Sequence, residues 1–120
     1  MKKLDYDQHI IDALKQLPVP LKTFDGHDVL FDEDKRKETI FEHIANKAHH
    51  LQLKDIEDIK RILSTKESLK PDKSGKKFRT YIGKRSKQKE RLKYLKISTR
   101  LKKDNKESVV TILNVKNNSW

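Results

Sequence analysis

The segment "LKYLKISTRL" at residues 92–101 decides the fold class, because its apolar side chains recur at every second position. One series contains Leu95, Ile97, Thr99 and Leu101, and the other contains Tyr94, Lys96, Ser98 and Arg100. Successive side chains of a strand point to opposite faces of a sheet. The segment therefore predicts a β-strand with one face in the core and one polar face.

Two neighbouring segments extend this pattern into a sheet. "FRTYI" at residues 78–82 alternates Phe78, Thr80 and Ile82 against Arg79 and Tyr81. "SVVTILNV" at residues 108–115 is apolar on both faces, as is typical of a central strand. The connections at residues 83–91 and 102–107 are polar and suit an antiparallel meander.

The first half of the chain has helical spacing instead. Apolar residues recur three or four positions apart in residues 4–17, 32–51 and 53–63, with a stop at "PVP" (18–20). "LKTFDGHDVLF" (21–31) surrounds an Asp-Gly dipeptide that favours a tight hairpin. We predict an α+β fold in which N-terminal helices pack against a C-terminal antiparallel sheet of about four strands. Residues 1–23 form an accessory helix with a Pro-rich link, and residues 24–120 form the main domain.

The composition excludes several functional classes. The chain has no cysteine, which removes disulfide frameworks, thiolate nucleophiles and cysteine zinc sites. No stretch approaches the roughly 18 to 20 apolar residues of a membrane span. The first ten residues, "MKKLDYDQHI", have acidic residues where a signal peptide has its apolar region. These features predict a cytoplasmic protein without a membrane partner.

Positive charge is concentrated in the second half of the chain. Residues 1–60 contain 10 Lys and Arg against 13 Asp and Glu, whereas residues 61–120 contain 19 against 5, so the halves carry −3 and +14. A cationic surface of this kind binds polyanions, because neutralised phosphates release counterions. We expect a nucleic-acid partner. The alternatives are a charged surface that serves solubility, or an acidic protein partner.

The polar face of the predicted sheet is a candidate binding surface. It would offer cations for phosphates and an aromatic ring for base stacking. The residues on that face are Arg79, Tyr81, Lys96, Ser98 and Arg100. Further nucleic-acid contacts are expected from Lys76, Lys77, Lys84 and Arg85 in the adjoining turns. The alternative is that these cations protect exposed strands from pairing with other chains.

Three of the five histidines lie in "EHIANKAHHL" at residues 42–51. On a continuous helix, His43, Lys47 and His50 would share one strip at the border of the core. An imidazole there could take a proton from a ribose 2′-OH while a cation stabilises the phosphorane. The alternative is an ordinary helix surface. The acidic residues 32–34 are explained by a helix start, so we expect no metal and no other cofactor.

The order of these segments resembles the phage and mobile-element branch of the barnase, EndoU, colicin and RelE-like nuclease superfamily. The similarity covers residues 24–120. It is carried by an "HI" pair followed by a basic residue and histidine, by the helix "LKDIEDIKRIL" (53–63), and by "KKFRTYIGKR" (76–85) and "ESVVTILNV" (107–115). The resemblance implies one or two helices followed by a curved antiparallel sheet, and an endoribonuclease toxin with RNA as its substrate and a cognate inhibitor or host protein as a partner.

The resemblance also implies roles for individual residues. His43 would act as base or acid, and Lys47 would be the basic residue that follows. The family's second histidine comes directly after that basic residue, where this chain has Ala48, so His50 is only a displaced candidate. Arg79 and Tyr81 would face the scissile phosphate. Thr111 would help to hold it if Val110 and Ile112 point to the core.

A second function fits the same charge pattern. A noncatalytic phage or mobile-element protein could bind nucleic acid, or inhibit a host nucleic-acid machine, through the basic half of the chain. The histidines distinguish the two functions, because a binder tolerates their loss and a nuclease does not.

Overall fold

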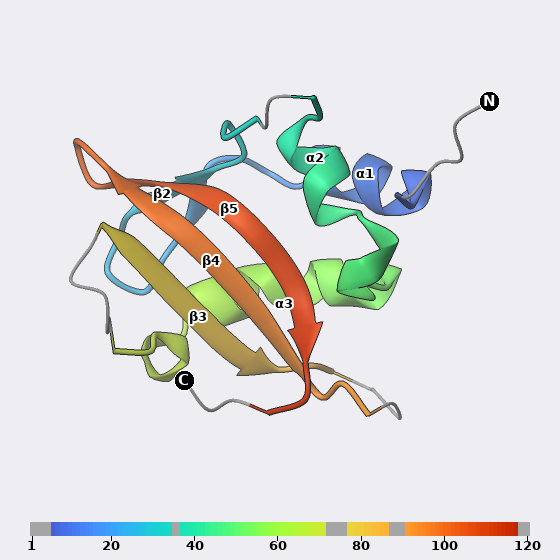
Figure 1. The fold of residues 1–120 in the computed structure, drawn as a ribbon. Coiled ribbons are helices and arrows are strands. Elements are labelled where there is room, and N and C mark those ends of the chain that lie inside the picture. Colours follow the sequence, from blue (N-terminus) through green and yellow to red (C-terminus); the bar gives the residue numbers. More distant parts are fainter. Residues whose placement is uncertain (1–5, 35–36, 72–76, 87–90, 118–120) are drawn as a thin grey trace.

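Five strands form one curled sheet in the order β1-β2-β5-β4-β3 (Figure 1). The computed structural model describes residues 6–34, 37–71, 77–86 and 91–117. The strands are β1 (Leu21–Lys22), β2 (Asp28–Leu30), β3 (Phe78–Lys84), β4 (Tyr94–Lys102) and β5 (Lys106–Val115). The α+β fold class is confirmed, and the three C-terminal strands form the predicted antiparallel meander.

The sheet has one strand more than expected and is mixed. β1 and β2 form the hairpin predicted around Gly26, which has a φ of 84° in the left-handed region that glycine tolerates. β2 then pairs in parallel with the start of β5, from Lys106 to Ser108. β5 is therefore a central strand, as its apolar character on both faces predicts. Beyond Ser108 its second edge has no pairing with β2.

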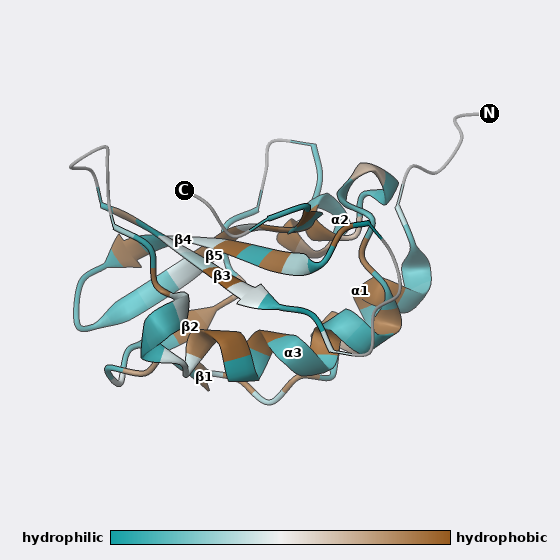
Figure 2. Cartoon of the chain, turned by 90° about the horizontal axis from the view of Figure 1, so that it is seen from below, coloured by the Kyte–Doolittle hydropathy of each residue, from teal (hydrophilic) through white to brown (hydrophobic). Residues whose placement is uncertain are grey.

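Helices cover one face of the sheet and one edge of β5. The helices are α1 (Gln8–Lys15), α2 (Ile40–Ile44), η1 (Lys47–His49), α3 (Leu53–Leu63) and η2 (Lys66–Ser68), of which η1 and η2 are 3-10 turns. α3 lies behind β3, β4 and β5 in Figure 1, and Figure 2 shows it below these three strands, beside β1 and β2. α1 packs on α3 and α2, while α2 and η1 pack along β5.

The core lies between these helices and the sheet. α1 supplies Ile10, Ile11 and Leu14, all buried in the same apolar cluster as the residues of α3 and the strands. The other buried hydrophobic residues of that cluster include Val29, Ile40, Ile44, Ile59, Ile62, Leu63, Leu95, Ile97, Val109 and Ile112. The spacing of three and four residues along α3 thus predicted the burial of Ile56, Ile59, Ile62 and Leu63, whereas Leu53, at the start of the helix, is exposed.

The predicted continuous helix over residues 32–51 is wrong. α2 ends at Ile44, and the backbone of Asn46 is extended (φ −54°, ψ 131°). The Asn46 side chain accepts a hydrogen bond from the Ala48 N–H at 2.9 Å, and the Ala45 carbonyl accepts one from Asp7 at 3.0 Å. These contacts replace the bonds that a continuing helix would make, because asparagine competes for the local backbone.

We predict that Gly83→Ala destabilises the protein, because a Cβ there would lie 2.5 Å from Cγ1 of the buried Ile62. The expected loss in the free energy of unfolding is about 1 to 3 kcal/mol, measured by urea denaturation. Ile62→Ala removes the obstructing atoms, so Gly83→Ala should cost little in that background. Equal costs in both backgrounds would contradict the steric explanation.

Candidate functional site

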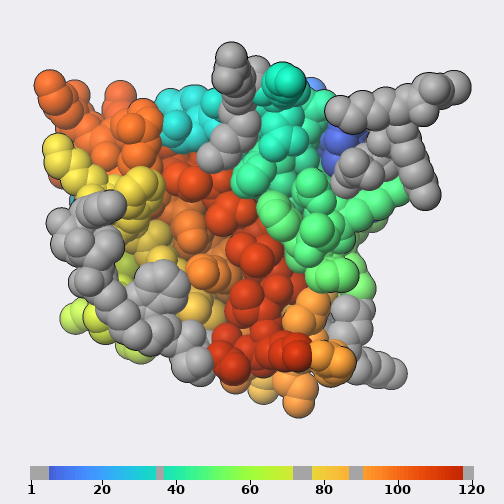
Figure 3. Space-filling model, viewed as in Figure 1, coloured from blue at the N-terminus to red at the C-terminus, as the bar shows by residue number. Residues whose placement is uncertain are grey.

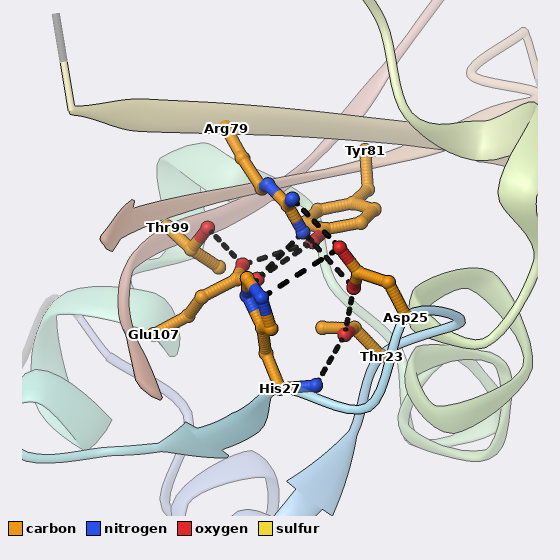
Figure 4. A network of polar contacts seen from close by, with 7 residues as sticks. All are labelled: Thr23, Asp25, His27, Arg79, Tyr81, Thr99 and Glu107. Atoms are coloured by element: carbon orange, nitrogen blue, oxygen red, sulfur yellow. Dashed lines mark hydrogen bonds and ion pairs between the residues drawn. The ribbon is translucent and has the colours of Figure 1, made fainter. Parts of the chain in front are cut away.

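A buried carboxylate organises one end of the sheet on its helix-facing side. The side chain of Glu107, in β5, is completely buried. It accepts hydrogen bonds from the hydroxyls of Tyr81 (2.9 and 3.1 Å) and Thr99 (2.7 Å), and from Nη1 of Arg79 (2.9 Å). These donors come from β3 and β4, so the carboxylate connects three adjacent strands (Figure 4). Full hydrogen bonding is what allows a charge to be buried.

The hairpin loop between β1 and β2 closes the same network. His27 places Nδ1 2.8 Å from Glu107, and its backbone N–H donates to the Thr23 hydroxyl at 2.9 Å. Because a carboxylate only accepts, the His27 Nδ1 carries the hydrogen. Asp25 accepts from Nη2 of Arg79 at 2.8 Å. The Arg79 guanidinium thus bridges the two carboxylates (Figure 4).

Hydrogen bonding and burial within the network keep Asp25 and Arg79 charged and Tyr81 neutral. The hydrogen bond from Arg79 holds the pKa of Asp25 far below its ordinary value, and the reciprocal bond raises the pKa of Arg79. Burial raises the pKa of the Tyr81 phenol well above its usual value. Asp25 and Arg79 therefore stay charged near neutral pH, and Tyr81 stays a neutral donor.

Three residues of the network could together ligate a metal ion, but the Arg79 guanidinium already binds both of their carboxylates. Asp25, His27 and Glu107 each offer one ligand atom, all within 4.8 Å of one another. Arg79 contacts both carboxylates at 2.8 and 2.9 Å. A metal ion would have to share these oxygens with a permanent cation, so the arrangement fits an arginine-centred ion network better than a metal centre.

The expected positions of Arg79 and Tyr81 are wrong. Arg79 pairs with Thr99 and Tyr81 pairs with Ile97, so both lie on the buried face of the sheet. The outer face of β3 instead carries Phe78, Thr80 and Ile82, opposite Arg100, Ser98 and Lys96 respectively. Arg79 and Tyr81 are thus separated from the other predicted binding residues by the thickness of the sheet.

The outer face keeps part of the predicted surface. Lys96, Ser98 and Arg100 lie on it, all partly exposed. Thr111 is opposite Ser98 and also partly exposed, while Ile112 is buried in the core. Figure 3 views this face, with β4 and β5 in orange and red and the segment of residues 40–50 in green along one side. Arg100 is an ion-pair partner of Glu33, which also binds Lys102 at 2.9 Å.

The residues expected in the turns divide into three cases. Lys77 and Lys84 are exposed at the two ends of β3. Arg85 is buried and unsuited to bind nucleic acid, because its guanidinium donates to both oxygens of Asp55, at 2.7 and 3.1 Å, and to the Leu92 carbonyl at 2.6 Å. Lys76 lies outside the described residues.

The histidine segment forms a different cluster from the one expected. Nδ1 of His43 lies 3.0 Å from a carboxylate oxygen of Glu38, and the His43 side chain is 27% exposed. The His43 and His49 rings meet edge to face with centroids 5.3 Å apart. Nδ1 of His49 donates to the Ile44 carbonyl at 3.1 Å. η1, which contains His49, packs on β5, so the imidazole pair lies at the edge of that strand.

The predicted strip of His43, Lys47 and His50 does not form. It required one continuous helix, whereas the chain turns at Asn46 and His50 adopts a left-handed conformation with φ 59°. His50 lines a pocket with Asn114 and Lys116 instead. Lys47 is exposed in η1, four residues from His43 but outside its helix.

Burial makes His49 a poor proton acceptor. Desolvation lowers the pKa of its imidazole, although the hydrogen bond to the Ile44 carbonyl acts in the opposite direction. The neutral ring uses its one N–H in that bond. His43 has its Nδ1 on Glu38 and, among the described residues, no partner at Nε2. A carboxylate that orients one nitrogen leaves the other available as a base.

Sequence patterns did not predict functional contacts for four of these residues, Glu38, His27, Asp25 and Glu107. Glu38 lies five residues before His43, beyond the one-turn spacing that links side chains on a helix. Glu107 lies 80 residues from His27 and 26 from Tyr81, so no local pattern connects them. One signal was present: an acidic residue begins an otherwise apolar strand of a basic half-chain.

We predict that Glu107→Gln lowers the free energy of unfolding by about 3 kcal/mol, because Arg79 then lacks its buried counter-charge. Urea denaturation measures the change. The control Glu57→Gln changes an exposed carboxylate on α3 and should stay within about 0.5 kcal/mol of the wild type. An equally small effect of Glu107→Gln would show that the network does not hold the sheet together.

None of the helices in the described ranges combines the length and apolar character needed to cross a bilayer. No protein-family model, curated protein or solved structure matches the chain.

Proposed function

We propose that the chain is a metal-independent endoribonuclease-like domain of a phage or mobile element, with His43 as its proton acceptor. The observation that carries the proposal is the Glu38–His43 pair, which orients Nδ1 and leaves Nε2 available at a partly exposed position. A net charge of +11 supports a polyanionic substrate. RNA as the substrate would place the activity in a cytoplasm.

The proposed reaction needs few groups. Nε2 of His43 takes the proton from a ribose 2′-OH, and the 2′ oxygen attacks the adjacent phosphorus. The bond from phosphorus to the 5′ oxygen breaks, and that oxygen takes a proton from solvent. The products are a 2′,3′-cyclic phosphate and a 5′-hydroxyl. Lys47 is an exposed cation near His43 that can stabilise the charge on the phosphorane.

The position of Thr111 is compatible with this site. The ring of His49 meets that of His43, and η1, which contains His49, packs on β5, the strand of Thr111. A phosphate bound at this edge could accept hydrogen bonds from the hydroxyls of Thr111 and Ser98, which are opposite each other. Arg79 and Tyr81 have no part in this arrangement because they lie in the Glu107 network.

The location of Arg79 and Tyr81 favours a second candidate function. A nuclease that lacks both residues at the phosphate has lost an arginine that would stabilise the transition state. A noncatalytic protein that binds nucleic acid or inhibits a host machine needs only the cationic surface. The two candidate functions predict different effects of replacing His43: a nuclease loses its cleavage activity, whereas a binding protein keeps its affinity for nucleic acid.

We predict that His43→Ala slows the cleavage of end-labelled RNA in EDTA by about 100-fold or more and does not weaken RNA binding. The wild type should release fragments that end in cyclic phosphate. The control His9→Ala changes an exposed histidine on α1 and should cleave normally. Intact RNA with salt-sensitive binding by the wild type would reject the nuclease and leave the binding protein.

We predict that Glu38→Gln slows cleavage by about 10-fold or more with an unchanged KM, because the amide no longer fixes the His43 tautomer. Glu42→Gln is the matched control, because the Glu42 carboxylate accepts a hydrogen bond from the Thr39 N–H (2.8 Å) at the start of α2 and not from His43. Single-turnover rates across pH measure the effect. If Glu38→Gln cleaves as fast as Glu42→Gln, Glu38 does not position the base.

A further inference from the structure

One corner of the sheet exposes an aromatic ring among cations. Phe78 begins β3 and is 43% exposed, although it belongs to a strand with a buried inner face. It pairs with Arg100, so both side chains lie on the outer face. The preceding residue, Lys77, is held beside β4 by a 2.7 Å hydrogen bond from the Leu101 N–H to its carbonyl. Figure 3 shows this corner, where the yellow start of β3 meets the orange hairpin between β4 and β5.

The cations at this corner outnumber the carboxylates. Lys77 and Arg100, with two further lysines, line an open depression of about 470 Å³. The cations are Lys77, Arg100, Lys102, Lys103 and Lys106, and the nearby carboxylates are Asp28, Asp32, Glu33 and Asp104. The lysines on the hairpin side are exposed. Single exposed apolar residues are ordinary on protein surfaces, but an aromatic ring beside several cations has the composition of a site for an unpaired base and its phosphates.

We propose that this Phe78 corner (Lys77, Phe78, Arg100, Lys102, Lys103 and Lys106) binds single-stranded RNA by stacking one unpaired base on the Phe78 ring. The inference rests on the proposed function for the choice of RNA. A flat ring accepts the face of any base, and that face is accessible only where the base is not stacked in a duplex. The lysines contact the adjoining phosphates, which fixes the strand without reading its sequence.

The position of the corner relative to the proposed cleavage site supports a continuous path for a strand. Phe78 and Thr80 lie on the same face of β3, and Thr80 is opposite Ser98. Two residues of a strand span about 7 Å, so Phe78 lies about 7 Å along the strand direction from Thr80, the β3 residue that is level with Ser98 and Thr111. Thr80 and Ile82 on this face are buried, so the exposed route from the edge of β5 to Phe78 runs over Ser98 and Arg100 of β4.

The test measures binding of a fluorescent 12-nucleotide oligoadenylate RNA and of a duplex RNA of the same length, both to the His43→Ala protein. Phe78→Ala should weaken binding of the single strand by about 5- to 100-fold and that of the duplex by less than about 2-fold. Phe78→Trp should retain the affinity. Phe78→Leu preserves apolar packing and folding, yet should lose affinity for the single strand as Phe78→Ala does. Leu53→Ala, which shortens an exposed side chain on α3, should change neither.

The dependence on salt separates stacking from charge. Phe78→Ala should leave the slope of log affinity against log salt unchanged, whereas Lys103→Ala should reduce it by about 0.7 for the single strand. Equal loss of duplex and single-strand binding in Phe78→Ala, or full binding in Phe78→Leu, would overturn the stacking site. If the protein with His43 intact does not cleave RNA, yet its binding of single-stranded RNA still depends on Phe78, the nuclease is rejected and the Phe78 corner stands as a binding site.

Discussion

The carboxylate of Glu107 is the constraint on which the arrangement of the sheet depends. A charge with no exposure to solvent is tolerated only when its hydrogen bonds are complete. Its partners are Tyr81, Thr99, Arg79 and His27, from β3, β4 and the hairpin loop. A shift of one residue in either strand would turn these donors to the other face. The network therefore specifies the register of β3 and β4 and holds the N-terminal hairpin to the sheet.

That register decides what the outer face can do. With Arg79 and Tyr81 bound to Glu107, the outer side of β3 carries Phe78, Thr80 and Ile82, of which only Phe78 is exposed. The face is less cationic at its centre than the alternating pattern indicated. Its remaining cations gather where the hairpin between β4 and β5 meets the start of β3. This corner is therefore the part of the described outer face where a polyanion meets several cations together.

The sequence predicted the positions of the strands better than it predicted which face of the sheet each side chain occupies. Alternation in β4 separated Leu95 and Ile97 from Lys96 and Ser98, because the two series differ clearly in polarity. In β3 both series contain an aromatic residue, so periodicity favoured turning Phe78 and Ile82 toward the helices. The contact between Tyr81 and Glu107, 26 residues apart, puts them on the outer face instead, where Phe78 is exposed and Ile82 is still buried. The helix containing His43 failed for a similar reason. Apolar spacing continues past Ile44, but the contact between Asp7 and Ala45 ends the helix there.

The short pairing of β2 explains why the histidines lie where they do. β2 contacts only the first three residues of β5, from Lys106 to Ser108, which leaves the following edge to be covered by another part of the chain. α2 and η1 cover it, and His49 lies in η1. His49, half-buried and bonded to the Ile44 carbonyl, therefore has a structural reason to be present, whereas the ring of His43 bonds the side chain of Glu38. Packing accounts for one imidazole of the pair, and the other is the one that requires a functional explanation.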